Sequence, residues 1–295
     1  MINLAHYNLT DAEHQILSGW LSASGGELNL EGLWSLMDAV WDELGCSNRT
    51  YNEELYGEFY RHPVWLLNGI FTEHDDESRS HRRAIVDLMS TFSPECVVDF
   101  GGGFGTLARM MAEALPSAEI DICEPYPPRY GVESCRRFSR IKFVPSLARD
   151  KYDVLVSTDV LEHVQDPLAL FAEMVSSVKP SGNLIVANCF YPVIKCHLPS
   201  TFHLRHNFSR FSHELGLDVV GPCPGSHAVV FKRERVVEPD WQRIRLLEAQ
   251  SKRTFARHQF KERYVTPWSA RLQYGLRNPA HYWKRLRCLL GASEK

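Results

Sequence analysis

The stretch Cys96-Val-Val-Asp-Phe-Gly-Gly-Gly-Phe-Gly-Thr-Leu-Ala108 decides the fold of this chain. A short apolar run carries an acid, Asp99, near its end, and a helix-forming run follows over residues 106–115. Between them stand four glycines: Gly101, Gly102, Gly103 and Gly105. This order predicts a strand, a tight turn and a helix, because glycine lets the backbone turn sharply and approach a ligand where a Cβ would collide. The turn follows the carboxyl end of its strand, where open α/β sheets bind ligands.

A glycine turn alone is compatible with NAD, a flavin, S-adenosylmethionine (SAM) or simple packing of a helix on a strand. Two acids narrow this choice. Asp99 places a carboxylate beside the turn, which would repel a pyrophosphate and attract the ammonium and sulfonium cations of SAM. Glu124 ends the next apolar run and can accept both hydroxyls of a ribose, which NAD and SAM share. Glu124 therefore indicates a nucleoside, and Asp99 favours SAM.

Predicted strands and helices alternate from residue 96 onward. The strands are expected at 96–99, 118–123, 141–144, 152–157, 183–188, 217–221 and 227–232, and the helices at 105–115, 130–138, 166–178 and 207–215. This alternation predicts an α/β fold with a doubly wound, mainly parallel, seven-stranded Rossmann-like sheet. Residues 221–226 are too few for a helical crossover, so the last strand should be antiparallel. Such a strand is unlike a plain dinucleotide-binding sheet and is a second indication of a methyltransferase.

The regions on either side of this alternation are predicted to be helical. Residues 1–92 should form an N-terminal cap over the binding face, with helices at 11–21, 28–44, 51–59 and 75–92. The aromatic residues of this cap are interpreted mainly as core: Trp34, Trp41, Tyr56, Phe59, Tyr60 and Trp65. Residues 93–233 would be the SAM-binding domain, and residues 234–295 a basic helical extension that begins with a charged helix over 240–260.

Composition limits the class of protein. The chain has 295 residues, of which 44% are hydrophobic, so wholesale disorder is excluded. No apolar run approaches the ~20 residues that span a bilayer, and the eight cysteines form no CxxC pair, so we expect a cytoplasmic protein with free thiols. The net charge of −3 hides a basic end, since residues 232–295 carry 16 Lys and Arg against 6 Asp and Glu. Such an end can contact a polyanion, a membrane surface, a second copy of the chain or the acidic body of its own chain.

Three segments and one acid resemble the class I SAM-dependent methyltransferases: residues 97–105, 152–167 and 178–186, and Glu124. The resemblance implies that the glycine turn and Asp99 hold the amino acid part of SAM and that Glu124 holds its ribose. It also implies that residues 157–161 line the cofactor and face the acceptor. Many relatives meet the adenine with an acid after the third strand, whereas this chain offers Ser146. The cofactor-binding residues implied in this way are Asp99, Gly101, Gly102, Gly103, Glu124, Ser146, Thr158 and Asp159.

The segment Asp159-Val-Leu-Glu-His163 looks like the polyprenyl catechol and ubiquinone-pathway O-methyltransferases. In those enzymes an acid followed by Glu-His at this spacing is associated with a divalent metal and with deprotonation of the acceptor. The resemblance makes Asp159, Glu162 and His163 candidate metal ligands. In the alternative interpretation, Glu162 and His163 only cap and orient their loop.

Methyl transfer to a hydroxyl requires alignment of the two reactants and removal of a proton. Histidine is the usual base at neutral pH. The candidates are His163 and, in the loop 191–206 after the predicted fifth strand, His197 and His203. His227 begins a predicted strand and is interpreted as structural.

These observations predict a SAM-dependent O-methyltransferase. A large aromatic cap suits a small or medium hydroxylated acceptor, and the loop 191–206 resembles methyltransferases from bacterial polysaccharide and secondary-metabolite clusters, so the acceptor would be a sugar, a glycan or a phenolic metabolite. Two alternatives remain open: a nucleic-acid or protein methyltransferase that uses the basic end, and a non-catalytic SAM-binding partner. A nucleic-acid partner is not expected, because no RNA-binding module is recognisable; a homodimer is compatible with the basic end.

Overall fold

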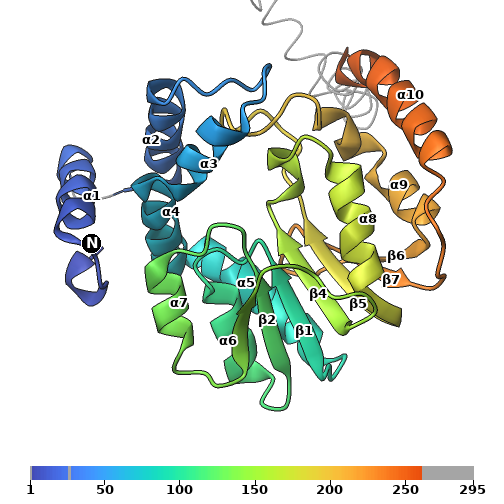
Figure 1. Ribbon diagram of the computed structural model, residues 1–295, viewed down its shortest axis with the longest axis horizontal. Coiled ribbons are helices and arrows are strands. Elements are labelled where there is room, and N and C mark those ends of the chain that lie inside the picture. Colours follow the sequence, from blue (N-terminus) through green and yellow to red (C-terminus); the bar gives the residue numbers. More distant parts are fainter. Residues whose placement is uncertain (1, 26–27, 261–295) are drawn as a thin grey trace, which may run out of the picture. The chain divides into compact units, whose positions relative to one another are not determined.

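The computed structural model describes residues 2–25 and 28–260. The chain divides into two compact units, Met1–Asp240 and Trp241–Lys295. The first unit contains a group of helices and a seven-stranded sheet (Figure 1). The binding residues that the sequence predicts all lie in this first unit.

The sheet has the strand order β3-β2-β1-β4-β5-β7-β6. Its strands are β1 (Cys96–Phe100), β2 (Glu119–Cys123), β3 (Ile141–Val144), β4 (Tyr152–Thr158), β5 (Val178–Ala187), β6 (Leu217–Pro222) and β7 (Val229–Arg233). Strands β1 to β5 pair in parallel, whereas β7 is inserted between β5 and β6 and runs antiparallel to both. The predicted α/β sheet and its antiparallel last strand are confirmed. The strand order reverses between β1 and β4, and a ligand site is expected at such a switch point.

Helices α6 (Thr106–Ala114), α7 (Arg129–Cys135), α8 (Pro167–Ser177) and α9 (Phe208–Glu214) connect these strands. They agree with the four predicted helices to within a turn. The central strands are apolar along their length because both faces are covered: Val154, Leu155 and Val156 of β4 are all fully buried. One core joins α6, β1 and β4 with the helix that leads into β1, α5 (Asp76–Ser90).

The N-terminal helices are α1 (Asp11–Ala23), α2 (Leu30–Glu43), α3 (Glu53–Arg61) and α4 (Pro63–His74). They have a core of their own, in which the ring of Trp41 meets that of Phe59 edge to face at 5.0 Å. The same core includes Ile194 and Leu198 from the loop that follows β5. The N-terminal helices of the predicted cap therefore pack together, and that loop packs with them, while their role as a cap over the binding face stays a prediction.

Helix α4 is absent from the sequence-based expectation. Its apolar residues surround the helix instead of forming one stripe, since Leu66, Leu67, Ile70 and Phe71 are all buried. The signal that could have revealed it is Pro63 at the first helical position, which is favourable because proline lacks only an N–H that would stay unpaired there. The Nδ1 atom of His62 caps this helix by accepting from the N–H of Val64 at 3.2 Å.

Phe104 joins the cap to the glycine turn. It stands between two glycines of the turn, and its ring stacks on Tyr130 at 4.8 Å and lies 6.3 Å from the ring of Tyr7. The ring also lies directly against the backbone of Gly69 in α4, where a Cβ would be 2.4 Å from Cδ2 of Phe104. Only a residue without a side chain fits at that point of α4.

Gly69→Ala should therefore destabilise the protein by about 1–3 kcal/mol, the usual cost of overpacking a core. Thermal unfolding measures this loss. The matched control is Gly19→Ala in α1, where a Cβ would have no atom within 4 Å. Alanine there should raise stability, because it favours helix over glycine. If both substitutions changed the thermal stability equally, the close contact between Gly69 and Phe104 would be contradicted.

Helix α10 (Trp241–Phe260) belongs to the second unit and confirms the predicted charged helix. Glu248 bonds Arg245 at 2.8 Å and Lys252 at 2.7 Å, and pairs at these spacings stabilise a helix. The remainder of the predicted basic extension, residues 261–295, lies outside the described residues.

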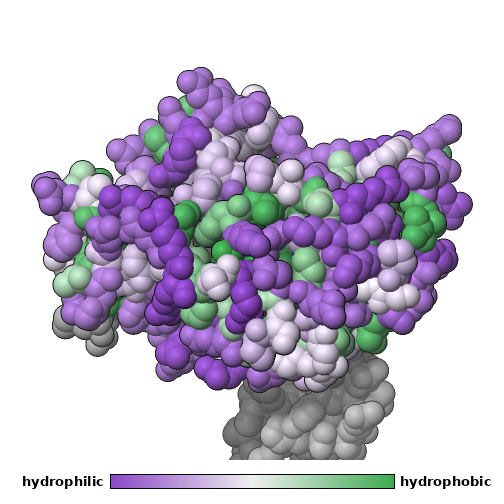
Figure 2. Space-filling model, turned by 60° about the horizontal axis from the view of Figure 1, so that its bottom comes forward, coloured by the Kyte–Doolittle hydropathy of each residue, from purple (hydrophilic) through white to green (hydrophobic). Residues whose placement is uncertain are grey.

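On the face shown in Figure 2, hydrophilic residues predominate and hydrophobic ones lie scattered among them. Across the part of the chain that the structure describes, none of the helices combines the length and the hydropathy needed to cross a bilayer.

Candidate functional site

The glycine turn after β1 is tightly folded. Gly101, Gly103 and Gly105 have φ angles of +73°, +45° and +71°, which side chains rarely allow. A Cβ on Gly101 would lie 2.4 Å from Cγ2 of Val160, and one on Gly102 would lie 2.7 Å from the carboxyl group of Asp99. The turn is thus packed against Val160, just after β4, and against Asp99, so contacts within the protein require glycine at positions 101 and 102.

Asp99 is a buried acid with an open hydrogen-bonding position. It is 1% exposed, and its Oδ2 atom has no hydrogen-bond partner among the described residues. Burial raises the pKa of Asp99 to about 7; Arg82 lowers it and Glu124 raises it further. A buried carboxylate with an unpaired oxygen is costly unless a ligand satisfies it. The ammonium group of a bound amino acid would do so.

Glu124 is fixed by the backbone on both sides. Its Oε2 accepts from the N–H of Gly103 at 2.9 Å, and its Oε1 accepts from the N–H of Tyr126 at 3.0 Å. Burial raises its pKa, and these two backbone donors oppose the rise. Each carboxylate oxygen keeps a second lone pair for a donor such as a ribose hydroxyl. The residues present therefore fit SAM.

The other predicted cofactor residues lie at the same edge of the sheet. Ser146 is exposed two residues after β3, Thr158 is the last residue of β4, and Asp159 follows it. Their position agrees with the predicted roles, and their contacts with a cofactor stay predictions.

Arg82 of α5 is a residue that sequence reasoning missed. Its guanidinium donates to the carbonyl of Ser78 at 3.0 Å. Burial lowers its pKa, while four acids oppose this shift: Asp99, Asp159, Asp75 and Glu73. Its guanidinium is therefore a partly buried cation within electrostatic reach of Asp99 and Asp159. Its signal in the sequence was weak, because it is one of three arginines on the helix that leads into the first strand.

A second polar cluster is formed by Glu162, His163 and His197. One possible ligand atom from each lies within 4.8 Å of those of the other two, and no other such cluster of His, Cys, Asp or Glu occurs among the described residues. Glu162 is fully buried; its Oε1 accepts from the N–H of Cys189 at 2.6 Å, and its Oε2 has no partner in the described part of the chain. Burial, followed by the charge of Asp159, raises the pKa of Glu162 to about 8.

The two histidines of this cluster face each other, with ring centroids 4.8 Å apart. Nδ1 of His163 lies 3.2 Å from the carbonyl of Cys196, and Nδ1 of His197 lies 2.8 Å from the carbonyl of Tyr191. Because a carbonyl only accepts, both Nδ1 atoms are assigned the proton and both Nε2 atoms keep a lone pair. Burial, and then His197, lower the pKa of His163 to about 3, and burial lowers that of His197. Both rings are neutral at neutral pH.

The structure thus brings together some of the predicted catalytic and metal-binding residues and separates others. His203 is buried in a 3-10 helix, Phe202–His206, and does not belong to the cluster. Asp159 does not belong to the cluster either. It contacts a different histidine, with its Oδ1 atom 3.4 Å from Nε2 of His227. The contact between His163 and His197 joins residues far apart in the chain, so local spacing could not reveal it.

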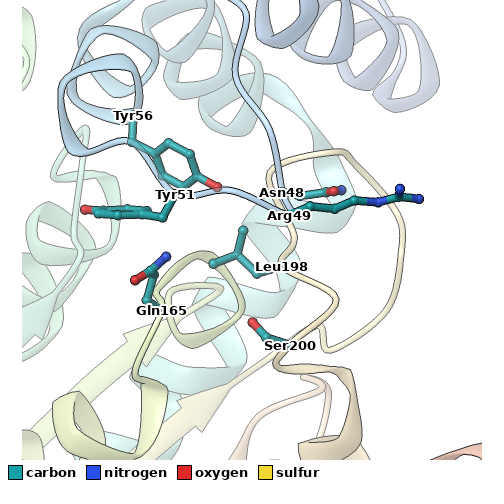
Figure 3. A pocket seen from close by; sticks show the side chains of 7 residues that line it. All are labelled: Asn48, Arg49, Tyr51, Tyr56, Gln165, Leu198 and Ser200. Carbon is teal, nitrogen blue, oxygen red and sulfur yellow. The ribbon is translucent and has the colours of Figure 1, made fainter.

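A hollow of about 210 Å³ lies between the cap and the loop after β5 (Figure 3). Its walls are Asn48, Arg49, Tyr51 and Tyr56 from the cap, Gln165 from the segment after β4, and Leu198 and Ser200 from the loop. Leu198 donates its N–H to the carbonyl of Glu162 at 2.9 Å, so the hollow shares a wall with the histidine cluster. It combines two aromatic rings with amide and hydroxyl groups.

Comparisons with known proteins agree on one family. The profile of a methyltransferase domain matches residues 74–216. Among curated proteins, an uncharacterised methyltransferase of Mycobacterium tuberculosis is 27% identical over 120 residues, which are 39% of this chain and 61% of that protein, and one of Mycobacterium bovis matches equally. The match thus spans less than two thirds of the length of these relatives.

Among solved structures, the CurJ carbon methyltransferase shares the fold with a TM-score of 0.52, 10% identity and coverage of 76% of this chain and 70% of that one. A Burkholderia thailandensis 1,6-didemethyltoxoflavin-N1-methyltransferase with bound S-adenosylhomocysteine gives a TM-score of 0.46 and 13% identity over 63% of this chain and 92% of that one. The segment matched by the family profile contains the glycine turn and both acids that face it. On this evidence residues 74–216 are a methyltransferase domain, with the fold of the class I SAM-dependent methyltransferases.

Proposed function

We propose that this protein transfers the methyl group of SAM to a hydroxyl group of a small or medium acceptor, either a sugar or glycan or a phenolic metabolite. The observation that carries this proposal is the buried carboxylate of Asp99, which keeps an unpaired oxygen beside the glycine turn. The family and the aromatic cap support it further. We also propose a cytoplasmic location, on the pattern of cysteines, and a homodimer as one role of the basic end.

The cofactor would be held by residues that need no rearrangement. Asp99 would accept from the ammonium group, Arg82 would meet the carboxylate, and Glu124 would accept from the ribose hydroxyls. When bound, SAM supplies an activated methyl carbon, so the protein has only to align the acceptor and receive its proton. Because these residues stand at the carboxyl ends of the parallel strands, the bound cofactor would lie at that edge of the sheet.

The hollow between the cap and the loop after β5 suits the proposed acceptor. The rings of Tyr51 and Tyr56 offer apolar faces, while the amides of Asn48 and Gln165 and the hydroxyl of Ser200 offer donors and acceptors. Small-molecule sites commonly combine aromatic walls with a few polar groups. A sugar ring or a phenol presents the matching surface.

The test is formation of S-adenosylhomocysteine by the purified protein with SAM and a panel of acceptors. The panel contains monosaccharides, nucleotide sugars, catechols and other phenols, with an RNA oligonucleotide and a protein extract for the alternative functions. Methylation of a hydroxylated small molecule is the expected result. Methylation of RNA or protein alone, or SAM binding without any turnover, would overturn the proposal.

A divalent metal at Glu162, His163 and His197 is a separate hypothesis. It accounts for the unpaired Oε2 of Glu162 and for two histidines whose Nε2 atoms keep lone pairs. On this hypothesis, dialysis against EDTA should abolish turnover, and Mn²⁺ or Mg²⁺ should restore it in the wild type and not in Glu162→Gln. Full activity of the metal-free protein would contradict it.

A further inference from the structure

The turn between β6 and β7 reaches the edge of the sheet at which the cofactor site lies. Because β7 runs antiparallel to β5 and pairs Val229 with Val186, residues 223–228 stand beside the carboxyl ends of the parallel strands. The N–H of Asp159, just after β4, donates to the carbonyl of Ala187 at the end of β5 at 2.9 Å. His227 is thereby brought next to Asp159.

Asp159 has an unusual backbone that aims its side chain. Its φ angle is +54°, in the left-handed region that residues other than glycine rarely adopt. Such conformations are concentrated at functional sites, where the surrounding structure holds them. Here the result is a carboxylate whose Oδ1 lies 3.4 Å from Nε2 of His227.

This pair differs from the buried histidines because the side chains of His227 and Asp159 remain 46% and 49% exposed. Helix α5 packs against the turn, and the ring of its His81 lies 5.4 Å from that of His227. Three charged groups act on His227: Asp159, Glu162 and Arg82. The hydrogen bond to Asp159 raises the pKa of His227, burial and Arg82 oppose this, and Glu162 raises it further.

We propose that His227, held by Asp159, accepts the proton of the acceptor hydroxyl. This role rests on the proposed function. With Nε2–H of His227 donating to Asp159, Nδ1 keeps a lone pair that can receive a proton. The acceptor oxygen loses its proton to Nδ1 and bonds to the methyl carbon, while the carbon–sulfur bond breaks and its electron pair stays on sulfur. The products are a methyl ether, S-adenosylhomocysteine and an imidazolium that Asp159 stabilises until water takes the proton.

The assignment separates the histidines of this chain by role. His163 and His197 have their Nδ1 atoms occupied by backbone carbonyls and their pKa values lowered, which suits a neutral structural or ligating group. His227 is accessible and has a carboxylate behind it, the arrangement that orients and stabilises a histidine base. Asp159 is then a positioning residue.

The experiment compares His227→Gln, Asp159→Asn and the wild type with a hydroxyl acceptor found by the panel above. His213→Gln, an exposed histidine on α9, is the matched control and should leave kcat unchanged. We expect His227→Gln to lower kcat about 10²–10⁴-fold, the usual contribution of a general base. Its affinity for SAM, measured by calorimetry, should stay within about twofold of the wild type, because the acids that would hold the cofactor are untouched.

The pH profile tests the role of Asp159. At saturating SAM, kcat/KM for the acceptor should rise with pH in the wild type as His227 loses its proton, and His227→Gln should lose this rise. Asp159→Asn preserves the left-handed backbone, since asparagine tolerates it, and removes the charge. The rise should then shift to lower pH. If Asp159 had only a structural role, the pH at which kcat/KM rises would be the same in Asp159→Asn and in the wild type.

Two failures can be told apart. If the wild type methylates a hydroxyl and His227→Gln does so at the same rate and with the same pH profile, the role of His227 is wrong and the proposed function stands. If the wild type binds SAM and methylates none of the hydroxyl acceptors, the proposed function is wrong and this role is wrong with it.

Discussion

Asp99→Asn should weaken the binding of SAM at least about a hundredfold, and should at the same time make the SAM-free protein more stable. The loss follows because removing one partner of a buried ion pair costs about 3–5 kcal/mol. The gain follows because the folded protein keeps this carboxyl in a buried place where its pKa is raised to about 7. Charging Asp99 above its unfolded pKa therefore costs folding free energy, which the neutral amide avoids.

The same pKa gives SAM binding a pH dependence. The ammonium group of SAM binds the ionised form of Asp99, which is the minor form below about pH 7 in the free protein. The dissociation constant should therefore fall as the pH rises from 6 to 8, and should be nearly constant for Asp99→Asn. Calorimetric titrations at several pH values measure both, and thermal unfolding measures the stability.

Asp121→Asn is the matched control, because Asp121 is a buried strand aspartate on the neighbouring β2. It differs from Asp99 in being paired, with Lys151 and with the hydroxyl of Tyr152 at 2.8 Å. Its amide should lower stability and leave SAM affinity unchanged. If the two substitutions moved stability in the same direction and affinity by the same factor, the open position on Asp99 would not be the cofactor contact.

Glu124→Gln should weaken the binding of both SAM and S-adenosylhomocysteine by about 30–100-fold. The carboxylate now accepts two backbone N–H groups, whereas an amide has one acceptor oxygen and would turn its NH₂ group toward the other donor. The variant therefore loses the charged acceptor for the ribose hydroxyls and also disturbs Gly103 in the turn. Because hydrogen bonds to charged groups are worth about 1.5–3 kcal/mol, the loss of one accounts for a factor of this size.

The control for this prediction is Glu119→Gln, an exposed glutamate at the opposite end of the same strand that pairs with Lys142 at 2.9 Å. Glu119→Gln should bind SAM and S-adenosylhomocysteine with the affinity of the wild type. Adenosine alone provides a second check, since it contains the ribose and lacks the amino acid part. Its binding should be sensitive to Glu124→Gln and insensitive to Asp99→Asn; the reverse pattern would exchange the assigned roles.

The sequence could predict that the residues of the candidate cofactor site lie together, because each of them lies at or just after the end of a readable strand. Asp99 and Glu124 each end an apolar run, and in a parallel sheet the ends of such runs meet at one edge. The strands themselves were readable because they are buried on both faces and hence apolar throughout. Helix α4 escaped for a related reason: being buried all round, it has no polar stripe and so no helical period.

The contacts of the candidate catalytic histidines could not be read from the sequence, because they depend on long-range packing. His163 meets His197 through the fold of the loop after β5, and His227 meets Asp159 because β7 is inserted beside β5. In the sequence, all these histidines are equivalent ionisable residues. Burial and hydrogen bonding make them different, and neither is a property of local spacing.

The contact between Phe104 and Gly69 has a kinetic consequence. The ring of Phe104 belongs to the glycine turn and rests on the backbone of Gly69 in α4. A cofactor bound on the proposed site would therefore also fix α4, and with it the helices that line the proposed acceptor hollow. We therefore expect an ordered sequence in which SAM enters first and S-adenosylhomocysteine leaves last, with the acceptor and its methylated product exchanging while the nucleoside is in place.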